Sequence, residues 1–408
     1  MKITTVLIIL LIFGLIDLYV FKGISGLIPG IQSRYKLMIT LGYWMVSIST
    51  LALMIYGIGN RHNFSSMNTL NIIIGVFITL LLPKLIFVLF HALDDIYNLV
   101  TLAYNRISAQ TDYSRRTFIS QLGLAASGFI FGSMVYGVIW GKFNFRVLHK
   151  DIVSSRIPGA FEGARIVQIS DTHLGSFGEC FEPVRKAVKM INQLEPDYVF
   201  FTGDLVNNHA KEARPWVEVF KGIRAKEGKY SVFGNHDYAD YGSYSQEERR
   251  QSVEELKEIH REMEFTLLED QNVQLTRGNE SIRLIGVHNW GKGFHQVGNL
   301  SKAINGCDPN EFKILLSHDP THFEEQVKHK TNIDLTLSGH THGMQMGIEI
   351  PFLNIKWSPV RMRYRRWAGL YEENGQKIYI NRGFGVLAYP GRVGMAPEIT
   401  LLTLKSKT

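Results

Sequence analysis

The 408-residue chain contains only two cysteines, Cys180 and Cys307, and their spacing is not that of a zinc ribbon or a redox-active dithiol. A metal site built from thiolate ligands is therefore not expected. A single disulfide is compatible with the sequence, but two unrelated thiols are the favoured interpretation. Internal repeats and low-complexity tracts are also absent, and the length allows two or three domains.

Charged side chains are almost absent from four long apolar stretches before Lys142. The stretches cover approximately residues 3–20, 37–56, 70–93 and 118–140. Each is close to the ~20 residues that a helix needs to cross a bilayer, so residues 1–141 are predicted to form four transmembrane helices. Asp17 and Lys84 are the only formal charges inside them. Both could be functional, but a structural role is the favoured interpretation.

Basic residues gather in two of the three loops between these stretches, and the whole chain has a net charge of +7. The first and third loops carry Lys22, Arg34, Lys36, Arg106, Arg115 and Arg116, whereas the second has only Arg61. Short basic loops stay on the cytoplasmic side of a plasma or inner membrane. Everything after Trp140 is therefore predicted to lie outside the cytoplasm.

A second signal concerns the same arginines. Ser114-Arg115-Arg116-Thr117-Phe118-Ile119 resembles a twin-arginine export motif and directly precedes an apolar stretch. The alternative is a pair of stop-transfer arginines flanking an ordinary span. Both interpretations place the arginines in the cytoplasm, so the predicted topology is the same.

The pattern changes after a linker and a leading strand at 142–164. From Arg165 to the end, short apolar runs alternate with amphipathic ones, which predicts an α/β domain over 165–408. Strands are expected at 165–170, 197–202, 230–233, 312–316 and 333–337, and helices at 182–194, 216–225 and 246–263. Ligands of such sheets gather just beyond the carboxyl ends of the strands.

Each of these five apolar runs ends in residues that could bind a metal. They are Asp171 and His173; Asp204; Asn235, His236 and Asp237; His318; and His340 and His342. One such residue could be a polar strand cap, but five successive cases favour a metal site. Oxygen and imidazole ligands suit manganese, iron or zinc, and two such ions can clamp the attacking and leaving oxygens of a hydrolysed phosphate.

The motifs Asp171-x-His173, Gly203-Asp204, Gly234-Asn235-His236-Asp237, His318 and Gly339-His340-x-His342 resemble those of the calcineurin-like metallophosphoesterase family, in the same order. The resemblance covers about residues 165–404. The segments 381–385 (NRGFG) and 397–402 (PEITLL) further resemble the bacterial membrane-anchored branch, some members of which use twin-arginine export. The family implies a four-layer α/β/β/α sandwich and two divalent metal ions.

The resemblance also implies a role for each motif residue. The first metal would be bound by Asp171, His173 and His342, the second by Asn235, His318 and His340, and both by Asp204. His236 would stabilise the transition state or protonate the leaving oxygen, with Asp237 orienting its imidazole. Asn207 and Asn208 stand where many members have an acidic residue, so a carboxylate role in that loop is in doubt.

The expected activity is metal-dependent hydrolysis of a phosphoester or phosphoanhydride, with a metal-activated hydroxide attacking phosphorus, on a lipid-linked or envelope substrate. One alternative is a tethered phosphodiesterase for soluble substrates such as nucleotides. Another is a non-catalytic membrane sensor or scaffold, which should have lost a ligand or His236. The chain has lost none of them.

A basic and aromatic stretch at 356–367 follows the last histidines. Arg361, Arg363, Arg365 and Trp367 are predicted to contact substrate or lipid headgroups. The alternation of the three arginines equally fits one solvated face of a strand. Nucleic acid is not an expected partner, because it conflicts with the predicted topology, and the sequence does not specify an oligomeric state.

Overall fold

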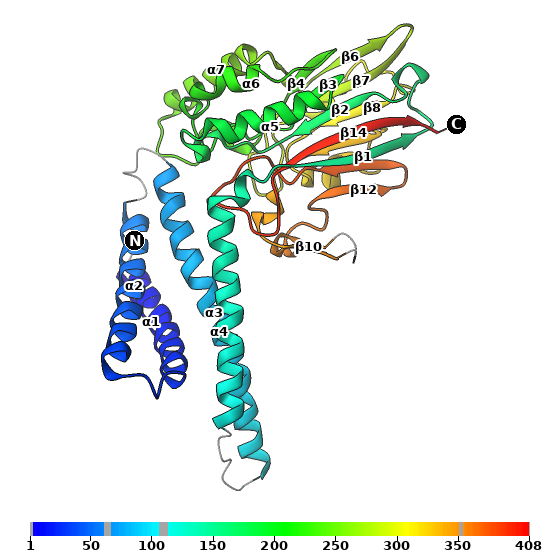
Figure 1. Ribbon diagram of the computed structural model, residues 1–408. Helices are drawn as coiled ribbons and strands as arrows, with labels where there is room; N and C mark the ends of the chain where they lie inside the picture. Colours follow the sequence, from blue (N-terminus) through cyan, green and yellow to red (C-terminus); the bar gives the residue numbers. More distant parts are fainter. Residues whose placement is uncertain (1–2, 61–66, 106–112, 351–352, 354, 408) are drawn as a thin grey trace. The chain divides into compact units, whose positions relative to one another are not determined.

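The computed structural model describes residues 3–60, 67–105, 113–350, 353 and 355–407. By its internal contacts the chain divides into two compact units, Met1–Ile139 and Trp140–Thr408. We describe each unit by itself, with the element labels of Figure 1.

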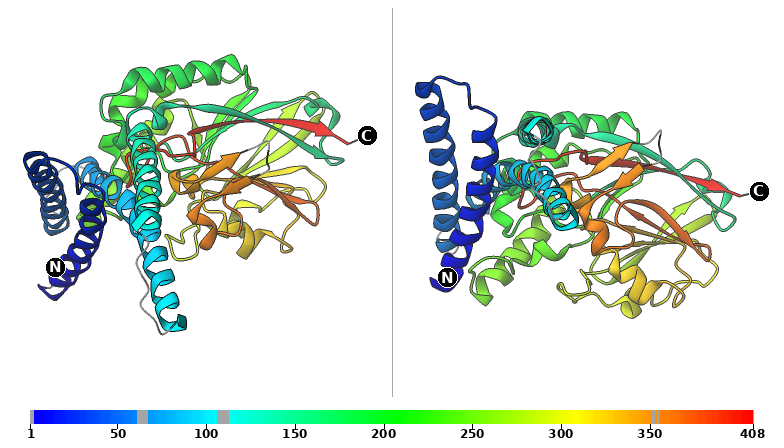
Figure 2. Two further views of the ribbon diagram at one scale, coloured as in Figure 1. Left: turned by 60° about the horizontal axis from the view of Figure 1, so that its bottom comes forward. Right: turned by 90° about the horizontal axis from the view of Figure 1, so that it is seen from below.

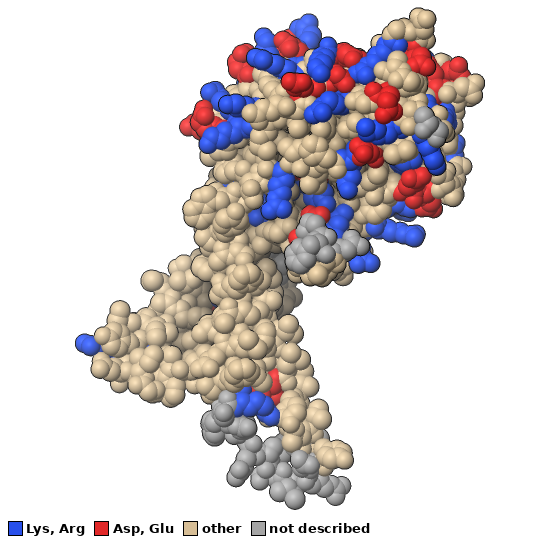
Figure 3. Space-filling view, turned by 45° about the vertical axis from the view of Figure 1, so that its right-hand side comes forward, with Lys and Arg blue, Asp and Glu red and all other residues tan. Residues whose placement is uncertain are grey.

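The amino-terminal unit consists of helices whose outward surface is apolar. They are α1 (Ile3–Gly26), α2 (Ser33–Gly59), α3 (Met67–Asn105) and α4 (Tyr113–Ile139). All four are long and apolar enough to cross a membrane, with mean hydropathies of 2.3, 1.7, 2.7 and 1.8 over their apolar segments. In the view of Figure 3 their surface is almost free of charged side chains, unlike that of the second unit. The four predicted helices are thus present.

The charged residues among these helices pair with one another. Lys84 Nζ lies 2.6 Å from Asp17 Oδ1, which also accepts hydrogen bonds from the Tyr43 and Ser47 hydroxyls. Mutual pairing of this kind is how intramembrane charges are normally accommodated. This pairing supports the structural interpretation of Asp17 and Lys84.

The two consecutive arginines at the start of α4 are also paired. Arg115 Nε lies 3.1 Å from Asp94 Oδ1, and Arg116 lies 3.6 Å from Asp95 Oδ1, so two adjacent carboxylates of α3 bind two adjacent arginines of α4. These contacts join the two helices that flank the third loop.

The second unit contains two six-stranded sheets. In spatial order the first is β1 (Arg146–Ser154), β14 (Glu398–Ser406), β2 (Arg165–Ile169), β3 (Tyr198–Phe201), β4 (Gly228–Ser231) and β5 (Thr266–Leu267). The second is β12 (Gly369–Glu373), β13 (Gln376–Ile380), β9 (Leu335–Ser338), β8 (Lys313–Leu316), β7 (Glu280–Gly286) and β6 (Gln271–Arg277). Strands β2, β3 and β4 are parallel, as crossover helices require.

Alternating side chains of these strands form two cores. Ile166 and Phe200 pack between the sheets, whereas Val167 and Phe201 pack under the helices α5 (Phe181–Gln193), α6 (Val217–Lys221) and α7 (Gln246–Glu262). On the far side, α8 (Leu300–Ala303) and a π-helical turn (Phe323–Val327) cover the second sheet. Figure 2 shows the green helices and the orange and yellow strands on opposite sides of the first sheet. This arrangement is the predicted α/β/β/α sandwich.

Three segments differ from the sequence-based expectations. The helix expected at 216–225 is shorter, because a 3-10 turn (Arg214–Trp216) precedes α6. Strand β14 inserts antiparallel to β2 and parallel to β1, which the sequence did not indicate. The arginines at 361–365 do not form a strand, because Pro359 begins a 3-10 helix (Pro359–Met362).

Candidate metal centre

The predicted ligands lie where the central strands end, and their backbones turn sharply there. The φ angle is positive at Asp171 (53°), His173 (44°), Asp204 (60°), His340 (70°) and His342 (51°). Residues other than glycine rarely adopt this conformation, which costs ~1–3 kcal/mol each and persists where surrounding contacts enforce it. Such strain at five candidate ligands indicates a functional site.

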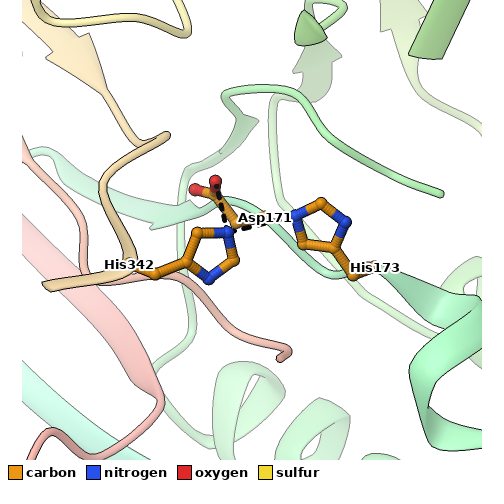
Figure 4. A group of neighbouring side chains, drawn as sticks. All are labelled: Asp171, His173 and His342. Atoms are coloured by element: carbon orange, nitrogen blue, oxygen red, sulfur yellow. Dashed lines mark hydrogen bonds and ion pairs between the residues drawn. The ribbon is translucent and has the colours of Figure 1, made fainter. Parts of the chain in front are cut away.

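The first ligand group is Asp171, His173 and His342, whose ligand atoms lie within 4.8 Å of one another. Figure 4 shows the two imidazoles turned toward each other beside the Asp171 carboxylate. His342 Nε2 is 3.1 Å from His173 Nε2 and 3.2 Å from Asp171 Oδ1. All three residues are buried.

The second group is Asp204, His318 and His340, also within 4.8 Å. His318 Nε2 lies 3.1 Å from Asp204 Oδ2 and 3.3 Å from His340 Nδ1, and Asn235 Oδ1 lies 2.8 Å from that same His340 Nδ1. Asp204 Oδ2 is in addition 3.6 Å from His173 Nε2 of the first group. This carboxylate therefore lies between the two groups.

Hydrogen bonds away from the site leave one nitrogen of His173 and one of His318 facing into it. His173 Nδ1 lies 3.1 Å from the Val206 carbonyl, and His318 Nδ1 lies 2.8 Å from the Thr202 carbonyl. Because a carbonyl can only accept, each Nδ1 must carry a proton, so the neutral form of each ring presents the lone pair of Nε2 to the site. A hydrogen bond from the ring nitrogen that faces away from the site is typical of metal-binding histidines.

The electrostatics of the site also favour cations. Burial alone would raise the pKa of the Asp171 and Asp204 carboxylic acids, but the neighbouring imidazoles hold both below the ordinary value. Burial would lower the pKa of His318, but the Asp204 and Asp171 carboxylates outweigh it and raise that pKa to about 10. Facing imidazole nitrogens and buried carboxylates thus draw positive charge into the site, and divalent ions fit these donors.

His236 lies beside the ligands, but Asp237 does not orient it. His236 Nδ1 lies 2.6 Å from the Asn207 carbonyl, and its ring stacks on Tyr241. The Asp237 carboxylate instead accepts hydrogen bonds from the backbone N–H groups of Asp204, Leu205, Val206 and Gly234. The expected contact between Asp237 and the imidazole is therefore wrong; Asp237 fixes the backbone that carries Asp204.

Glu212 supplies a carboxylate to the loop of Asn207 and Asn208, the loop in which the sequence left a carboxylate role in doubt. It accepts hydrogen bonds from the backbone N–H groups of Asn207 (2.7 Å), Asn208 (3.1 Å) and His209 (3.2 Å). Burial raises the pKa of Glu212 to about 7, although these donors favour the ionised form. Glu212 was not among the predicted site residues, although its place three residues after His209 matches a capping box.

Replacing Glu212 with glutamine should therefore destabilise the second unit. The amide NH2 group would face at least one backbone donor and leave it unpaired, at a cost of about 1–3 kcal/mol. We expect a lower midpoint of thermal unfolding, by roughly 2–4 °C for each kcal/mol. The matched control is Glu182→Gln, whose side chain is 75% exposed and pairs only with Arg185. Equal midpoints of thermal unfolding for the two variants would exclude the proposed role of Glu212.

The NRGFG segment wraps around the Asp171 strand end. Phe384 N–H donates to the Ser170 carbonyl and Gly385 N–H to the Asp171 carbonyl. A Cβ atom at Gly385 would lie 1.9 Å from the Thr172 carbonyl oxygen, so only glycine fits. The buried Arg392 guanidinium donates to the carbonyls of Gly383 and Gly385. Arg392 was missed, because nothing in the sequence distinguishes it from a surface arginine.

Of the predicted substrate or membrane-surface residues, only the arginines are exposed. Arg361, Arg363 and Arg365 lie at the surface. Trp367 is 4% exposed and packs with Val360, Tyr364, Ala368 and Met395, so its predicted surface role is wrong. A tryptophan cannot be distinguished as core or surface by its neighbours in sequence alone.

The stretch nevertheless contacts the metal centre. Tyr364 OH lies 2.9 Å from His340 Nε2, on the side of that ring opposite the ligand nitrogen. The Thr341 hydroxyl donates to the Trp367 carbonyl. Tyr364, which the sequence analysis did not single out, thus holds a candidate ligand in place.

Comparisons with known proteins agree with this geometry. Residues 1–142 match a family model described as "Probable Calcineurin-like phosphoesterase, transmembrane domain", and residues 164–344 match the calcineurin-like phosphoesterase model. The metallophosphoesterase YkuE of Bacillus subtilis is 31% identical over 304 residues, which cover 72% of this chain and 98% of that protein.

Two further relatives differ in extent. The metallophosphoesterase Cj0846 of Campylobacter jejuni is 26% identical over 98% of both chains. A transmembrane protein with metallophosphoesterase domain from Danio rerio is 28% identical over 66% of this chain, which spans only 60% of that relative. This chain is an integral membrane protein that belongs to the calcineurin-like phosphoesterase family of metal-dependent hydrolases.

Proposed function

We propose that the chain hydrolyses its substrate at a binuclear centre. The observation that carries this proposal is Asp204, whose Oδ2 atom lies within 3.6 Å of His173 Nε2 and 3.1 Å of His318 Nε2, one from each ligand group. A carboxylate between two cation sites offsets the repulsion between them. Asp171, His173 and His342 would hold one ion, and Asn235, His318 and His340 the other.

The bound ions would activate water and offset the charge of the phosphate. The residues of the chain would position the reacting groups and supply a proton to the leaving oxygen. The Asn207 carbonyl accepts from His236 Nδ1 and fixes the ring, so that Nε2 of the protonated imidazolium can donate to the leaving oxygen or stabilise the transition state. Tyr241 stacks on this ring, with 4.3 Å between ring centroids, and its hydroxyl accepts from Asn235 Nδ2. These contacts link the proposed acid to a proposed ligand.

For the substrate, we propose a lipid-linked or envelope phosphoester. Helix α4 ends at Ile139 and the second unit begins at Trp140, so no long linker separates the domain from the membrane helix. Membrane tethering also suits a phosphodiesterase for soluble substrates such as nucleotides. The two candidates differ only in substrate, because the same metal centre serves both.

A substrate panel tests the proposal. The purified, metal-loaded protein is incubated with lipid phosphates, lipid pyrophosphates, nucleotides and simple phosphate esters, and released phosphate or product is measured. We expect the highest kcat/KM on a lipid-linked compound. A preference for nucleotides would favour the second candidate, and no turnover of any substrate would contradict both.

We further propose that the second unit lies outside the cytoplasm and that the arginine pair is an export signal. A reporter fused after residue 408 should be active if it requires export and silent if it requires the cytoplasm. Changing Arg115 and Arg116 together to lysine keeps the charges that face Asp94 and Asp95 but removes the twin-arginine signature. We expect export to fail in this variant. Normal export would mean that the pair only sets topology and joins α3 to α4.

A further inference from the structure

Exposed apolar side chains of the catalytic unit gather in one short segment. Ten of its described large hydrophobic residues are exposed, and six of these lie within residues 344–362. The six are Met344 (55%), Ile348 (52%), Leu353 (56%), Ile355 (44%), Trp357 (48%) and Met362 (92%). The other four, Trp140, Val153, Tyr241 and Val297, are scattered along the chain. We call the six residues the hairpin surface.

A small hairpin organises this surface. Strand β10 (Ile348–Ile350) pairs antiparallel with β11 (Ile355–Trp357), which places Ile348 opposite Trp357. Directly opposed residues share a face of a sheet, and so do residues two apart, so Ile348, Trp357 and Ile355 lie on the same face. Clustered exposure of this kind marks an interaction site rather than ordinary surface variation.

Three arginines beside the hairpin surface form no ion pair among the described residues, whereas Arg366 pairs with Glu324 and Glu373. Among the described residues, no acidic side chain forms an ion pair with Arg361, Arg363 or Arg365. Between residues 344 and 368 the only acidic residue is Glu349, and it binds Arg382. An apolar surface beside unpaired arginines fits an anionic lipid interface, where acyl chains and headgroups satisfy both.

The same segment is joined to the metal-binding loop. Met344 follows His342 by two residues, the Ser358 hydroxyl donates to the Gly343 carbonyl, and Tyr364 OH contacts His340. The hairpin surface is therefore joined directly to the loop that carries the candidate ligands His340 and His342. The guanidinium group of Arg363 also lies 4.8 Å from the ring of Phe294, whose edge contacts the His340 ring.

We propose that the hairpin surface inserts into the lipid interface and delivers a membrane-borne phosphate to the metal centre. The lipid is that of the membrane in which the protein is anchored. Helix α4 is long and apolar enough to cross a bilayer, and it ends at the residue before the catalytic unit. The delivery step depends on the proposed function, whereas the insertion does not. The proposal thus names lipid, rather than a second protein, as the occupant of this surface.

The insertion is tested on the full-length protein in nanodiscs. Cys180 and Cys307 are replaced by serine, and a fluorophore is attached at Ile355→Cys. We expect spin-labelled lipids to quench the probe, and anionic lipid to strengthen the quenching. The control is Val153→Cys, which is 43% exposed in β1 outside the hairpin surface and should stay unquenched. Equal signals at both sites, or shielding of the Ile355 probe without lipid quenching, would overturn the lipid assignment.

The delivery is tested by turnover of a lipid-embedded and a soluble phosphate ester in the same nanodiscs. The double variant Ile355→Glu, Trp357→Glu should lower the ratio of lipid to soluble turnover by about tenfold or more, since each buried apolar group and nearby arginine adds to interfacial binding. Val153→Glu should leave the ratio unchanged. An unchanged ratio in the double variant would overturn delivery. No turnover of either ester by the unmutated protein would contradict the proposed function, while quenching still tests insertion.

Discussion

Replacing Asp204 with asparagine is expected to lower phosphoester hydrolysis by about 1,000-fold or more and to reduce the metal content of the purified protein. The carboxylate lies between the two ligand groups, and its Oδ1 also accepts the His236 backbone N–H. Asparagine keeps the shape but removes the charge that would offset the two proposed cations. Losing several kcal/mol of such stabilisation corresponds to about three decades in rate. Elemental analysis and initial rates measure the two effects.

The control for Asp204 is a nearby aspartate outside the site. Asp240 pairs with Arg249 at 3.0 Å and His295 at 2.8 Å, and neither partner is a candidate ligand. Asp240→Asn should keep its metals and nearly full activity. Two metals per chain and full activity in Asp204→Asn would show that this carboxylate is not the bridging ligand.

Replacing His236 with alanine is expected to lower the rate by ~100- to 10,000-fold while both metals stay bound. The His236 ring is anchored by Asn207 and Tyr241, and neither ligand group includes it. The loss should therefore appear in kcat, with the metal content unchanged. Esters with good leaving groups should lose less rate, because they depend less on protonation of the leaving oxygen.

His295 provides a closely matched control. Its ring also stacks on a tyrosine, Tyr238, with the same 4.3 Å between ring centroids, but it faces Asp240 and no candidate ligand. His295→Ala should retain most of the activity. If His236→Ala loses metal in proportion to rate, the residue belongs to the ligand shell and its proposed role as an acid fails.

The strands that end in ligands could be predicted because each apolar run stops at a polar residue. Strands β2, β3 and β8 fall within the expected segments, and β9 extends one residue beyond its segment. The parallel order of β2 and β3 follows from the helix between them. Likewise the four membrane helices follow from length and hydropathy alone. These features are local, so a single stretch of sequence carries the information.

Other features depend on residues that are far apart in the chain, which is why they escaped prediction. Asp237 turned out to bind backbone N–H groups of the Asp204 loop, a contact that only the folded loop creates. Trp367 is buried because Met395 and Val360 pack against it, and within the 356–367 stretch the exposed tryptophan is Trp357. For Asp237 and Trp367 the residue type indicated importance, but the contacts that the fold creates decided what each residue does.

Strand β14 has a consequence for how the domain is made. It fills the position between β1 and β2, with Thr400 opposite Gln168, so the first sheet has a gap until residues 398–406 have been synthesised. Pairings at such sequence separation form slowly, and until then β1 and β2 present unpaired edges. The Asp171 strand end is completed by the NRGFG segment just before β14. The first sheet is therefore complete only once β14 has paired with both of its neighbours, and the segment that closes the Asp171 strand end leads directly into that strand.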